Sequence, residues 1–269
     1  MSAEKLNSEH ALLSAMLSDP GTERRDNEDA CGSYVESPTH VVVAVADGVS
    51  GEEGGEIASR TAIDVTLRTY RESPASWGPA KRLFRAAQDA NIEIHDRALV
   101  VTELRGMSTT LTAVAIDRGS AHAVHVGDSR LYLIREGRCV QKTKDHTVTA
   151  RRVRIGVVSA ERAKSHPGRS TLTRSLGREL IAAIDRITFT VADGDILLLC
   201  SDGLYNVLTD DELLKGALRS DPEGACRDLI GAANTRGAPD NVTVAILHVK
   251  GPSGVAPTPG WRGLLGRWG

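Results

Sequence analysis

Three runs of aliphatic and β-branched residues, each bordered by aspartate, constrain the fold of this chain most. They are VVVAVAD at residues 41–47, DILLLCSD at 195–202 and DNVTVAIL at 240–247. Their length and composition predict buried β-strands. A charged carboxylate at the edge of such a strand costs free energy unless it is paired, hydrogen-bonded or bound to metal, and few basic residues adjoin these runs. A site for a hard divalent metal ion therefore accounts best for the pattern.

Composition and charge are those of an ordinary globular chain. Of the 269 residues, 41% are hydrophobic and 25% are charged, which permits one large core. The formal net charge of -2 excludes a global basic field, so we expect no nucleic-acid binding and no membrane association. The four cysteines are widely spaced and form no CxxC pair, which indicates reduced thiols and a cytoplasmic protein. The segment HALLSAML is too short to span a membrane and lacks a basic leader.

The predicted elements fall into blocks of strands and blocks of helices. A buried strand is followed by two helices, and then three strands with short turns predict an antiparallel meander. A strand, two helices and a last strand end the series. In chain order the elements are 41–46, 55–71, 79–99, 108–117, 120–127, 130–137, 195–200, 209–218, 222–235 and 242–249.

Segments of unusual composition divide the chain. Residues 145–180 are rich in Arg, Lys, His and Thr and lack a long apolar run, so we expect an exposed flap with one or two short helices. We expect an N-terminal extension at 1–18, one domain at 19–250, and a Pro/Gly-rich linker with a Trp-containing tail at 251–269. The tail, which ends in WRGLLGRWG, is either a docking or membrane-surface peptide or a disordered end with incidental aromatics.

Short motifs, taken in order, resemble the metal-dependent protein Ser/Thr phosphatases of type 2C, the PPM family, in their compact bacterial form. The resemblance runs from Arg24 to Val249 and rests on RRDNED, VADGVSGEEGGEIAS, GMSTTLTAV, VGDSRLYLIREG, KDHT, HPGRSTLTRSLG, GDILLLCSDGL and PDNVTV. It implies an α+β fold, a four-layer α-β-β-α sandwich of two antiparallel sheets flanked by helix pairs. The first two predicted helices would cover one sheet and the last two would cover the other.

The resemblance also implies a metal centre. Two Mn²⁺ or Mg²⁺ ions would hold a bridging water or hydroxide that attacks the phosphoryl group. A third ion, found in bacterial relatives, would use Asp128 and the carbonyl of Ser170, although Asp128 could instead be a turn residue that bonds its own loop. Further residues are matched by motif position: Asp47, Gly48 through its carbonyl, Asp202 and Asp240 as metal ligands, and Glu28 and Asp29 as holders of metal-bound water.

A basic residue is expected to bind the substrate phosphate. Arg24 has the spacing from Asn27 that the family's phosphate-binding arginine shows, and its planar fork suits bidentate contact. Arg25 is the neighbouring alternative.

Two departures from the family limit the analogy. Many eukaryotic members place a histidine, a candidate proton donor, after the Asp-Gly pair, where this chain has Val49. A metal-bound water is then the preferred acid, ahead of His146 or His166 in or near the flap. The second departure is a basic run that is either a solvated charged face or an attractor of acidic substrates. It comprises Arg151, Arg152 and Arg154.

The function implied by the resemblance is hydrolysis of phosphoserine and phosphothreonine in proteins, opposing a Ser/Thr kinase in bacterial signalling. The expected partners are phosphorylated proteins and that kinase, and the expected state is a monomer. One alternative is a catalytically inactive relative that binds phosphoproteins or acts as a scaffold. Another is a regulator of an anti-sigma-factor antagonist, although such regulators commonly carry sensor domains. The presence of Asp47, Asp202 and Asp240 favours an active enzyme over the inactive relative.

Overall fold

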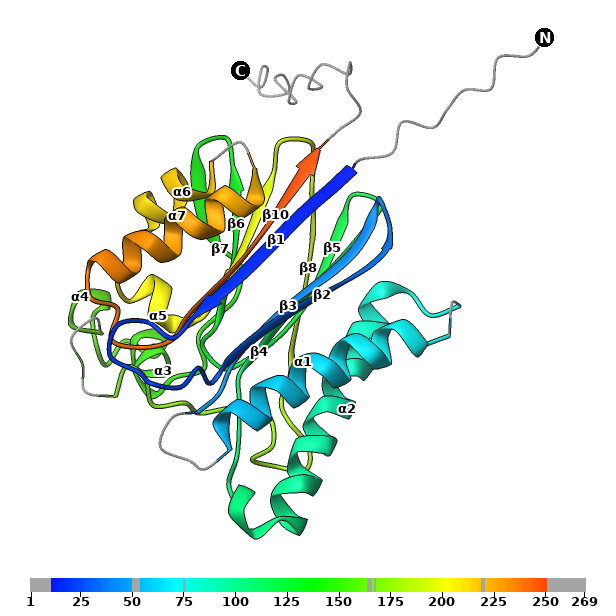
Figure 1. Ribbon diagram of the computed structural model, residues 1–269, viewed down its shortest axis with the longest axis vertical. Helices are drawn as coiled ribbons and strands as arrows, with labels where there is room; N and C mark the ends of the chain where they lie inside the picture. Colours follow the sequence, from blue (N-terminus) through cyan, green and yellow to red (C-terminus); the bar gives the residue numbers. More distant parts are fainter. Residues whose placement is uncertain are drawn as a thin grey trace, which may run out of the picture.

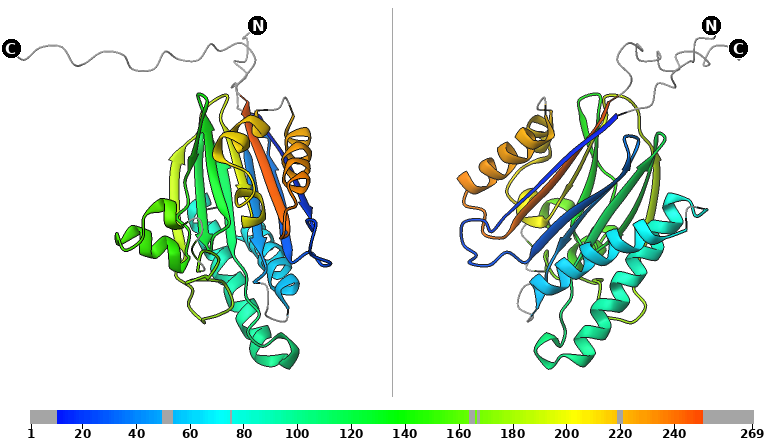
Figure 2. Two further views of the ribbon diagram at one scale, coloured as in Figure 1. Left: turned by 90° about the vertical axis from the view of Figure 1, so that its left-hand side faces the viewer. Right: turned by 45° about the vertical axis from the view of Figure 1, so that its right-hand side comes forward.

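Two antiparallel sheets pack face to face, with a helix pair on the outer face of each (Figures 1 and 2). The computed structural model describes residues 11–49, 54–74, 76–163, 166, 168–218 and 221–250. Within these residues each sheet has five strands. The four-layer α-β-β-α sandwich expected from the sequence is therefore confirmed.

The first sheet has the order β1-β10-β9-β6-β7 and the second has the order β2-β3-β4-β5-β8. The strands of the first are β1 (Ala11–Asp19), β6 (Arg130–Arg135), β7 (Arg138–Gln141), β9 (Ile196–Cys200) and β10 (Val242–Lys250). The strands of the second are β2 (Asp29–Ser37), β3 (His40–Asp47), β4 (Leu111–Asp117), β5 (Ser120–Val126) and β8 (Asp185–Thr190).

Long helices cover the outer faces of the sheets. Helices α1 (Gly55–Glu72) and α2 (Pro79–Val100) lie on the second sheet, and α6 (Asp210–Ala217) and α7 (Pro222–Thr235) lie on the first (Figure 1). These are the pairs expected from the sequence. The short elements are the 3₁₀ helix η1 (Thr102–Leu104) and helices α3 (Val148–Arg154), α4 (Ala160–Ala163) and α5 (Asp202–Tyr205).

The apolar run of β3 shows why these strands are apolar on both faces. Side chains of successive strand residues point to opposite faces of a sheet. Val41, Val43 and Val45 join the core between the two sheets, whereas Val42 and Ala44 join the core beneath α1 and α2. A strand buried on both faces reads as a continuous hydrophobic run rather than an alternating one.

All of strand β1 except its last residue, Asp19, lies in the expected N-terminal extension, 1–18. It pairs with β10 along its whole length, from Ala11 opposite Lys250 to Asp19 opposite Val242. The sheet therefore includes part of that segment. The tail at 251–269 lies outside the described residues. None of the helices that the structure describes is both long and apolar enough to cross a membrane.

Antiparallel pairing brings the acidic motifs to one end of the sandwich. Asp29 at the start of β2 pairs with Asp47 at the end of β3. In the other sheet, Cys200 at the end of β9 pairs with Arg130 and Val244, near the starts of β6 and β10. The residues just beyond these strand ends, Asp128, Asp202 and Asp240, therefore lie at the same end as Asp47.

Candidate metal and phosphate site

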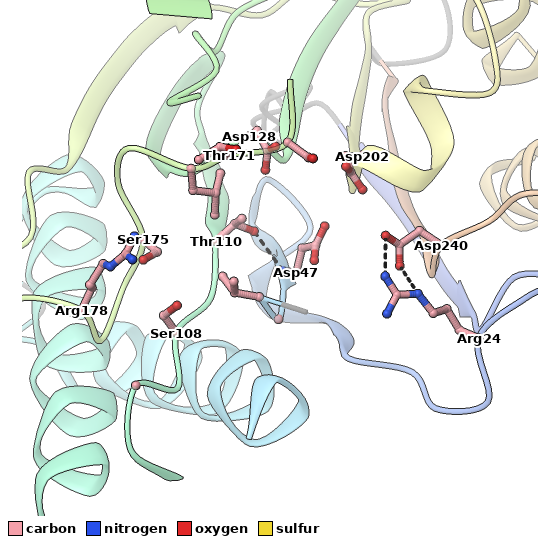
Figure 3. Close-up of a pocket in the computed structure, with 15 residues that line it drawn as sticks. Arg24, Asp47, Ser108, Thr110, Asp128, Thr171, Ser175, Arg178, Asp202 and Asp240 are labelled. Carbon is pink, nitrogen blue, oxygen red and sulfur yellow. Dashed lines mark hydrogen bonds and ion pairs between the residues drawn. The ribbon is translucent and has the colours of Figure 1, made fainter. Parts of the chain in front are cut away.

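A cavity of about 340 Å³ opens at this end of the sandwich (Figure 3). Four carboxylates and two guanidinium groups line it, together with hydroxyl and backbone groups. The lining residues are Arg24, Asp47, Gly48, Val49, Gly106, Ser108, Thr110, Asp128, Ser170, Thr171, Leu172, Ser175, Arg178, Asp202 and Asp240. Of Arg24 and the residues expected to bind metal ions or metal-bound water, only Glu28 and Asp29 are outside this lining.

Asp47 is held at the end of β3 by two neighbouring threonines. Its backbone N–H donates to Thr110 Oγ1 at 2.9 Å, and its carbonyl accepts from Thr109 Oγ1 at 2.8 Å and from the Thr110 N–H at 2.9 Å. Both threonines are buried. The backbone of Asp47 is thus fixed by local bonds while its carboxylate remains available to the cavity.

Asp29 lies behind the cavity, between the two sheets. Its carboxylate accepts a hydrogen bond of 2.6 Å from Ser201 Oγ, and Ser201 Oγ in turn accepts one from the Thr243 N–H at 2.9 Å. The side chain of Glu28 approaches Gly55 at the start of α1, where a β-carbon would lie 2.7 Å from Glu28 Oε1. The acidic pair therefore stands next to the metal ligands expected from the sequence.

Asp128 and Asp202 are joined through Tyr205. Asp202 is the first residue of the short helix α5, and Tyr205 in the same helix donates from its hydroxyl to the Asp128 carbonyl at 3.1 Å. The guanidinium of Arg130 stacks on the Tyr205 ring, 3.6 Å from the centroid, and binds Asp145 through two nitrogens. This network holds the loop of Asp128 against the helix of Asp202.

Arg24 contacts Asp240 directly. Arg24 Nε lies 3.1 Å from Asp240 Oδ1 and Arg24 Nη2 lies 3.2 Å from Oδ2, and both side chains are more than a third exposed. Arg25 is exposed and is not part of the cavity lining. The loop that carries Arg24 is fixed by Asn241, whose amide donates to the carbonyls of Pro20 and Asp26.

Burial and mutual repulsion raise the pKa values of four aspartates at the site, Asp29, Asp47, Asp128 and Asp202. Burial is the largest cause for each of them. The pKa of Asp29 is raised to about 7 and that of Asp202 to about 6, with repulsion from neighbouring aspartates as a further cause. The pKa values of Asp47 and Asp128 are raised well above the ordinary range for the same reasons. A bound cation would remove this repulsion.

The donor set fits divalent metal ions. In the part of the chain that the structure describes, no three Asp, Glu, His or Cys side chains are close enough together to hold one ion between them. Nevertheless Asp47, Asp128, Asp202 and Asp240 line one cavity, and their oxygen atoms are the ligand type that Mg²⁺ and Mn²⁺ prefer. Burial first, and repulsion from neighbouring aspartates second, raise the pKa values of Asp47, Asp128 and Asp202, and a bound cation would favour the charged form of each.

Two glycines allow the backbone to approach closely at the site. A β-carbon on Gly48 would lie 2.4 Å from the Gly55 carbonyl oxygen, and one on Gly203 would lie 2.1 Å from the Asn241 carbonyl oxygen. A side chain at either position would force these backbone segments apart. These glycines follow Asp47 and Asp202, so the tight packing fixes both aspartates.

The remaining candidates of the flap region occupy different places. Ser170 is exposed and lines the cavity. His146 is buried; its Nδ1 accepts from the Gly127 N–H at 3.1 Å, and its Nε2 lies 3.2 Å from Asp185. Burial lowers the pKa of His146, and the nearby Arg174 lowers it further. Neither His146 nor His166 is among the residues that line the cavity.

Several residues of the site were missed by the sequence analysis. They are Thr109, Thr110, Ser175, Arg178, Ser201, Tyr205 and Asn241. The signal for Asn241 and Ser201 was within reach, because each lies beside a candidate aspartate at the end of a buried strand. A polar residue in such a place needs a hydrogen-bond partner.

Two proteins of similar sequence are named as protein phosphatases. A protein of Streptococcus pyogenes serotype M6, called "Putative protein phosphatase 2C-type", is 31% identical over 239 residues, which are 87% of this chain and 96% of that protein. The serine/threonine protein phosphatase PstP of Mycobacterium tuberculosis is 36% identical over 242 residues, which are 88% of this chain but only 45% of PstP.

A solved structure shares the fold. The crystal structure of the catalytic domain of PstP in complex with two manganese ions superposes with a TM-score of 0.79 at 31% identity, covering 90% of this chain and 99% of that one. Residues 22–224 match the family described as protein phosphatase 2C. This match, the two relatives and the shared α-β-β-α architecture place the chain in the protein phosphatase 2C family.

Proposed function

We propose that this chain hydrolyses phosphoserine and phosphothreonine in proteins in a reaction that depends on divalent metal ions. The observation that carries the proposal is the common cavity of Asp47, Asp128, Asp202, Asp240 and Arg24. It combines an acidic wall with a guanidinium group that suits a phosphate.

The residues that we propose for two metal ions all line this cavity. Asp47, the carbonyl of Gly48, Asp202 and Asp240 would hold two Mn²⁺ or Mg²⁺ ions. When bound, such ions activate a water molecule and neutralise the charge of a phosphate ester, whose uncatalysed hydrolysis is very slow. The PstP catalytic domain, a structural neighbour, contains two manganese ions. A third ion at Asp128 and Ser170 belongs to the same proposal, because both residues line the cavity.

Residues around the ligands would orient water and substrate. Glu28 and Asp29 stand behind the ligands, where their carboxylates would hold and orient water. Arg24 would bind the phosphate oxygens of the substrate. Its present contact with Asp240 keeps the guanidinium at the mouth of the cavity. Since Val49 lines the cavity where a histidine could donate a proton, we propose that water protonates the leaving alcohol.

The biological setting of the proposal is signalling by protein phosphorylation. Phosphorylated proteins would be the substrates, and a Ser/Thr kinase would supply them. Relatives named as serine/threonine phosphatases support this assignment. We also propose a cytoplasmic monomer, consistent with four free cysteines.

Hydrolysis assays test the function. The purified chain should hydrolyse p-nitrophenyl phosphate and phosphothreonine peptides with Mn²⁺ or Mg²⁺, and EDTA should stop both reactions reversibly. Calorimetric titration with Mn²⁺ should show binding independently of turnover. Metal binding without any hydrolysis would reject the enzyme and support an inactive phosphoprotein-binding relative.

A further inference from the structure

The cavity has a second wall, opposite Asp202 and Asp240. Ser108, Ser175 and Arg178 line this wall, and Figure 3 shows them on one side of the cavity with Asp202, Asp240 and Arg24 on the other. The volume of about 340 Å³ falls within the range of roughly 300–1,000 Å³ typical of small-molecule pockets. The cavity therefore has room for more of a substrate than one phosphoryl group.

Arg178 is exposed and has no carboxylate partner in the part of the chain that the structure describes. Among the described residues it takes part in no ion pair or side-chain hydrogen bond, whereas Arg24 is paired with Asp240 and Arg174 with Asp185. Arginine is always charged at neutral pH and presents five donors in a rigid fork. An unpaired guanidinium in the wall of a substrate cavity is thus a candidate for binding an anion from the substrate.

The backbone that carries Arg178 is fixed to α2 by a buried amide. Asn91, only 1% exposed, accepts from the Gly177 N–H at 2.9 Å and donates to the carbonyls of Glu179 and Leu180, each at 3.0 Å. Gly177 has φ +89°, and a β-carbon there would lie 2.3 Å from Ile94 Cγ2. Residues 177–180 are therefore held in one conformation on both sides of Arg178.

The same segment is joined to the proposed metal centre. The N–H of Leu176 donates to the Thr109 carbonyl at 2.8 Å, and the N–H of Thr109 donates to the Leu176 carbonyl at 3.2 Å. Thr109 Oγ1 also donates to the carbonyl of Asp47. The position of Arg178 is consequently fixed relative to Asp47, as selective recognition of a second group on one substrate requires.

Ser175 supplies an independent sign that the cavity binds a ligand. It lines the cavity and is 6% exposed, yet its buried Oγ has no hydrogen-bond partner among the residues that the structure describes. Buried hydroxyl groups without a partner are uncommon, and each requires an explanation. A ligand atom in the cavity would provide that partner.

We infer that Arg178 and Ser175 form an anion subsite that binds a second negative group of the substrate, a carboxylate or a second phosphate near the phosphorylated residue. The inference rests on the proposed phosphatase function and deepens it, since it assigns a preference for acidic or multiply phosphorylated segments. Arg178 would provide the charge, and Ser175 would donate one hydrogen bond.

Matched phosphothreonine peptides test the subsite. One pair carries Glu or Gln on both sides of the phosphothreonine, and another carries phosphoserine or serine at one flanking position. The wild-type chain should show a higher kcat/KM for the anionic member of each pair. Arg178→Ala should reduce this anionic-to-neutral ratio about tenfold, mainly through KM, as expected for loss of a charge-assisted hydrogen bond at a partly exposed site. Ser175→Ala should reduce the ratio by a smaller factor.

Arg154→Ala is the matched control. Arg154 is an exposed arginine of α3 outside the cavity lining, so its removal subtracts the same charge without altering the subsite. An equal fall of the ratio in this variant would show long-range steering and overturn the inference. A ratio that falls only for the doubly phosphorylated peptide, or only for the Glu peptide, would identify the source of the anion.

The proposed function and the subsite fail in different ways. Hydrolysis of p-nitrophenyl phosphate, which has no flanking group, reports the function alone. A wild-type chain that hydrolyses it but does not distinguish the paired peptides overturns the subsite and leaves the function intact. A metal-loaded chain that fails to hydrolyse it overturns the function and the subsite with it.

Discussion

The hydroxyl of Tyr205 donates a hydrogen bond to the backbone carbonyl of Asp128 at 3.1 Å, and this bond joins two segments of the acidic site. Tyr205 lies in the helix that Asp202 begins, whereas Asp128 lies between β5 and β6. The ring of Tyr205 also packs beneath the guanidinium of Arg130. The Tyr205 side chain thus holds the loop of Asp128 close to the helix that Asp202 begins.

The substitution Tyr205→Phe should weaken the link between the Asp128 loop and α5 while keeping the aromatic ring. The stacking with Arg130 remains, but the Asp128 carbonyl loses a donor, which typically costs about 1 kcal/mol of stability. We expect a lower urea midpoint and weaker Mn²⁺ binding by calorimetry. Tyr34→Phe is the control, since Tyr34 makes a ring contact with Tyr70 far from the site. Unchanged Mn²⁺ affinity in Tyr205→Phe would limit Tyr205 to a structural role.

The substitution Asp47→Asn should separate activity from stability. Loss of this carboxylate should reduce kcat by more than about a hundredfold, because even residues outside a ligand set can cost that much. In EDTA, however, the variant should be more stable than the wild type by on the order of 1 kcal/mol, because asparagine avoids the cost of burying or neutralising an ionisable group among like charges. Turnover assays and urea unfolding measure the two effects. Asp96→Asn, at an exposed position of α2, should change neither.

The carboxyl group of Asp29 should make metal-free stability depend on pH. Its pKa is raised to about 7 in the folded chain, compared with about 3.9 in an unfolded one. Between these values the folded state binds more protons, so the contribution of Asp29 to stability rises as pH falls from about 7 to about 4.

Comparing the stability of the wild type with that of a variant separates the contribution of Asp29 from that of the histidines. The pKa of His125 is lowered to about 4 by burial, which acts in the opposite direction as pH falls. Comparison of the wild type with Asp29→Asn in EDTA cancels that contribution. The stability of the wild type relative to the variant should increase from pH 7.5 to pH 5. Saturating Mn²⁺ should weaken the trend, since the positive charge of nearby metal ions would lower the pKa of Asp29. A pH-independent difference would show that Asp29 is already ionised at neutral pH.

Sequence patterns identified the strands that are buried on both faces, but they missed strands with weaker patterns. β1 has the sequence ALLSAMLSD, rich in residues that favour helices, and only pairing with the distant β10 makes it a strand. β2 and β8 were missed as well. β8 alternates between half-buried and exposed positions and forms the edge of its sheet, so no apolar run marks it.

The site shows the same division between local and distant information. Asp47, Asp202 and Asp240 adjoin buried strands, so their charges stand out in the sequence, whereas Asp29 was expected only from the family resemblance. The groups that position these aspartates act across the fold: Ser201 contacts Asp29 from 172 residues away. Arg178 has no such strand beside it, and only the arrangement of α2, β3 and residues 176–180 places it in the cavity. Residue type and order point to the candidate ligands, whereas tertiary pairing determines which groups support them.

Arg24 and Arg25 offer the last prediction, because two adjacent residues with the same charge occupy different environments. Arg24 contacts Asp240 and lines the cavity, whereas Arg25 is exposed outside the lining. If Arg24 binds the phosphate equally in the ground state and the transition state, Arg24→Ala should raise KM for phosphothreonine peptides about tenfold and change kcat little. Arg24→Lys should restore only part of the affinity, since lysine keeps the charge but not the planar fork. Arg25→Ala should leave KM within about twofold of the wild-type value, because an exposed charge outside the cavity contributes little binding energy. Steady-state kinetics with saturating Mn²⁺ measure all three variants, and a larger KM effect in Arg25→Ala would assign phosphate binding to Arg25 instead.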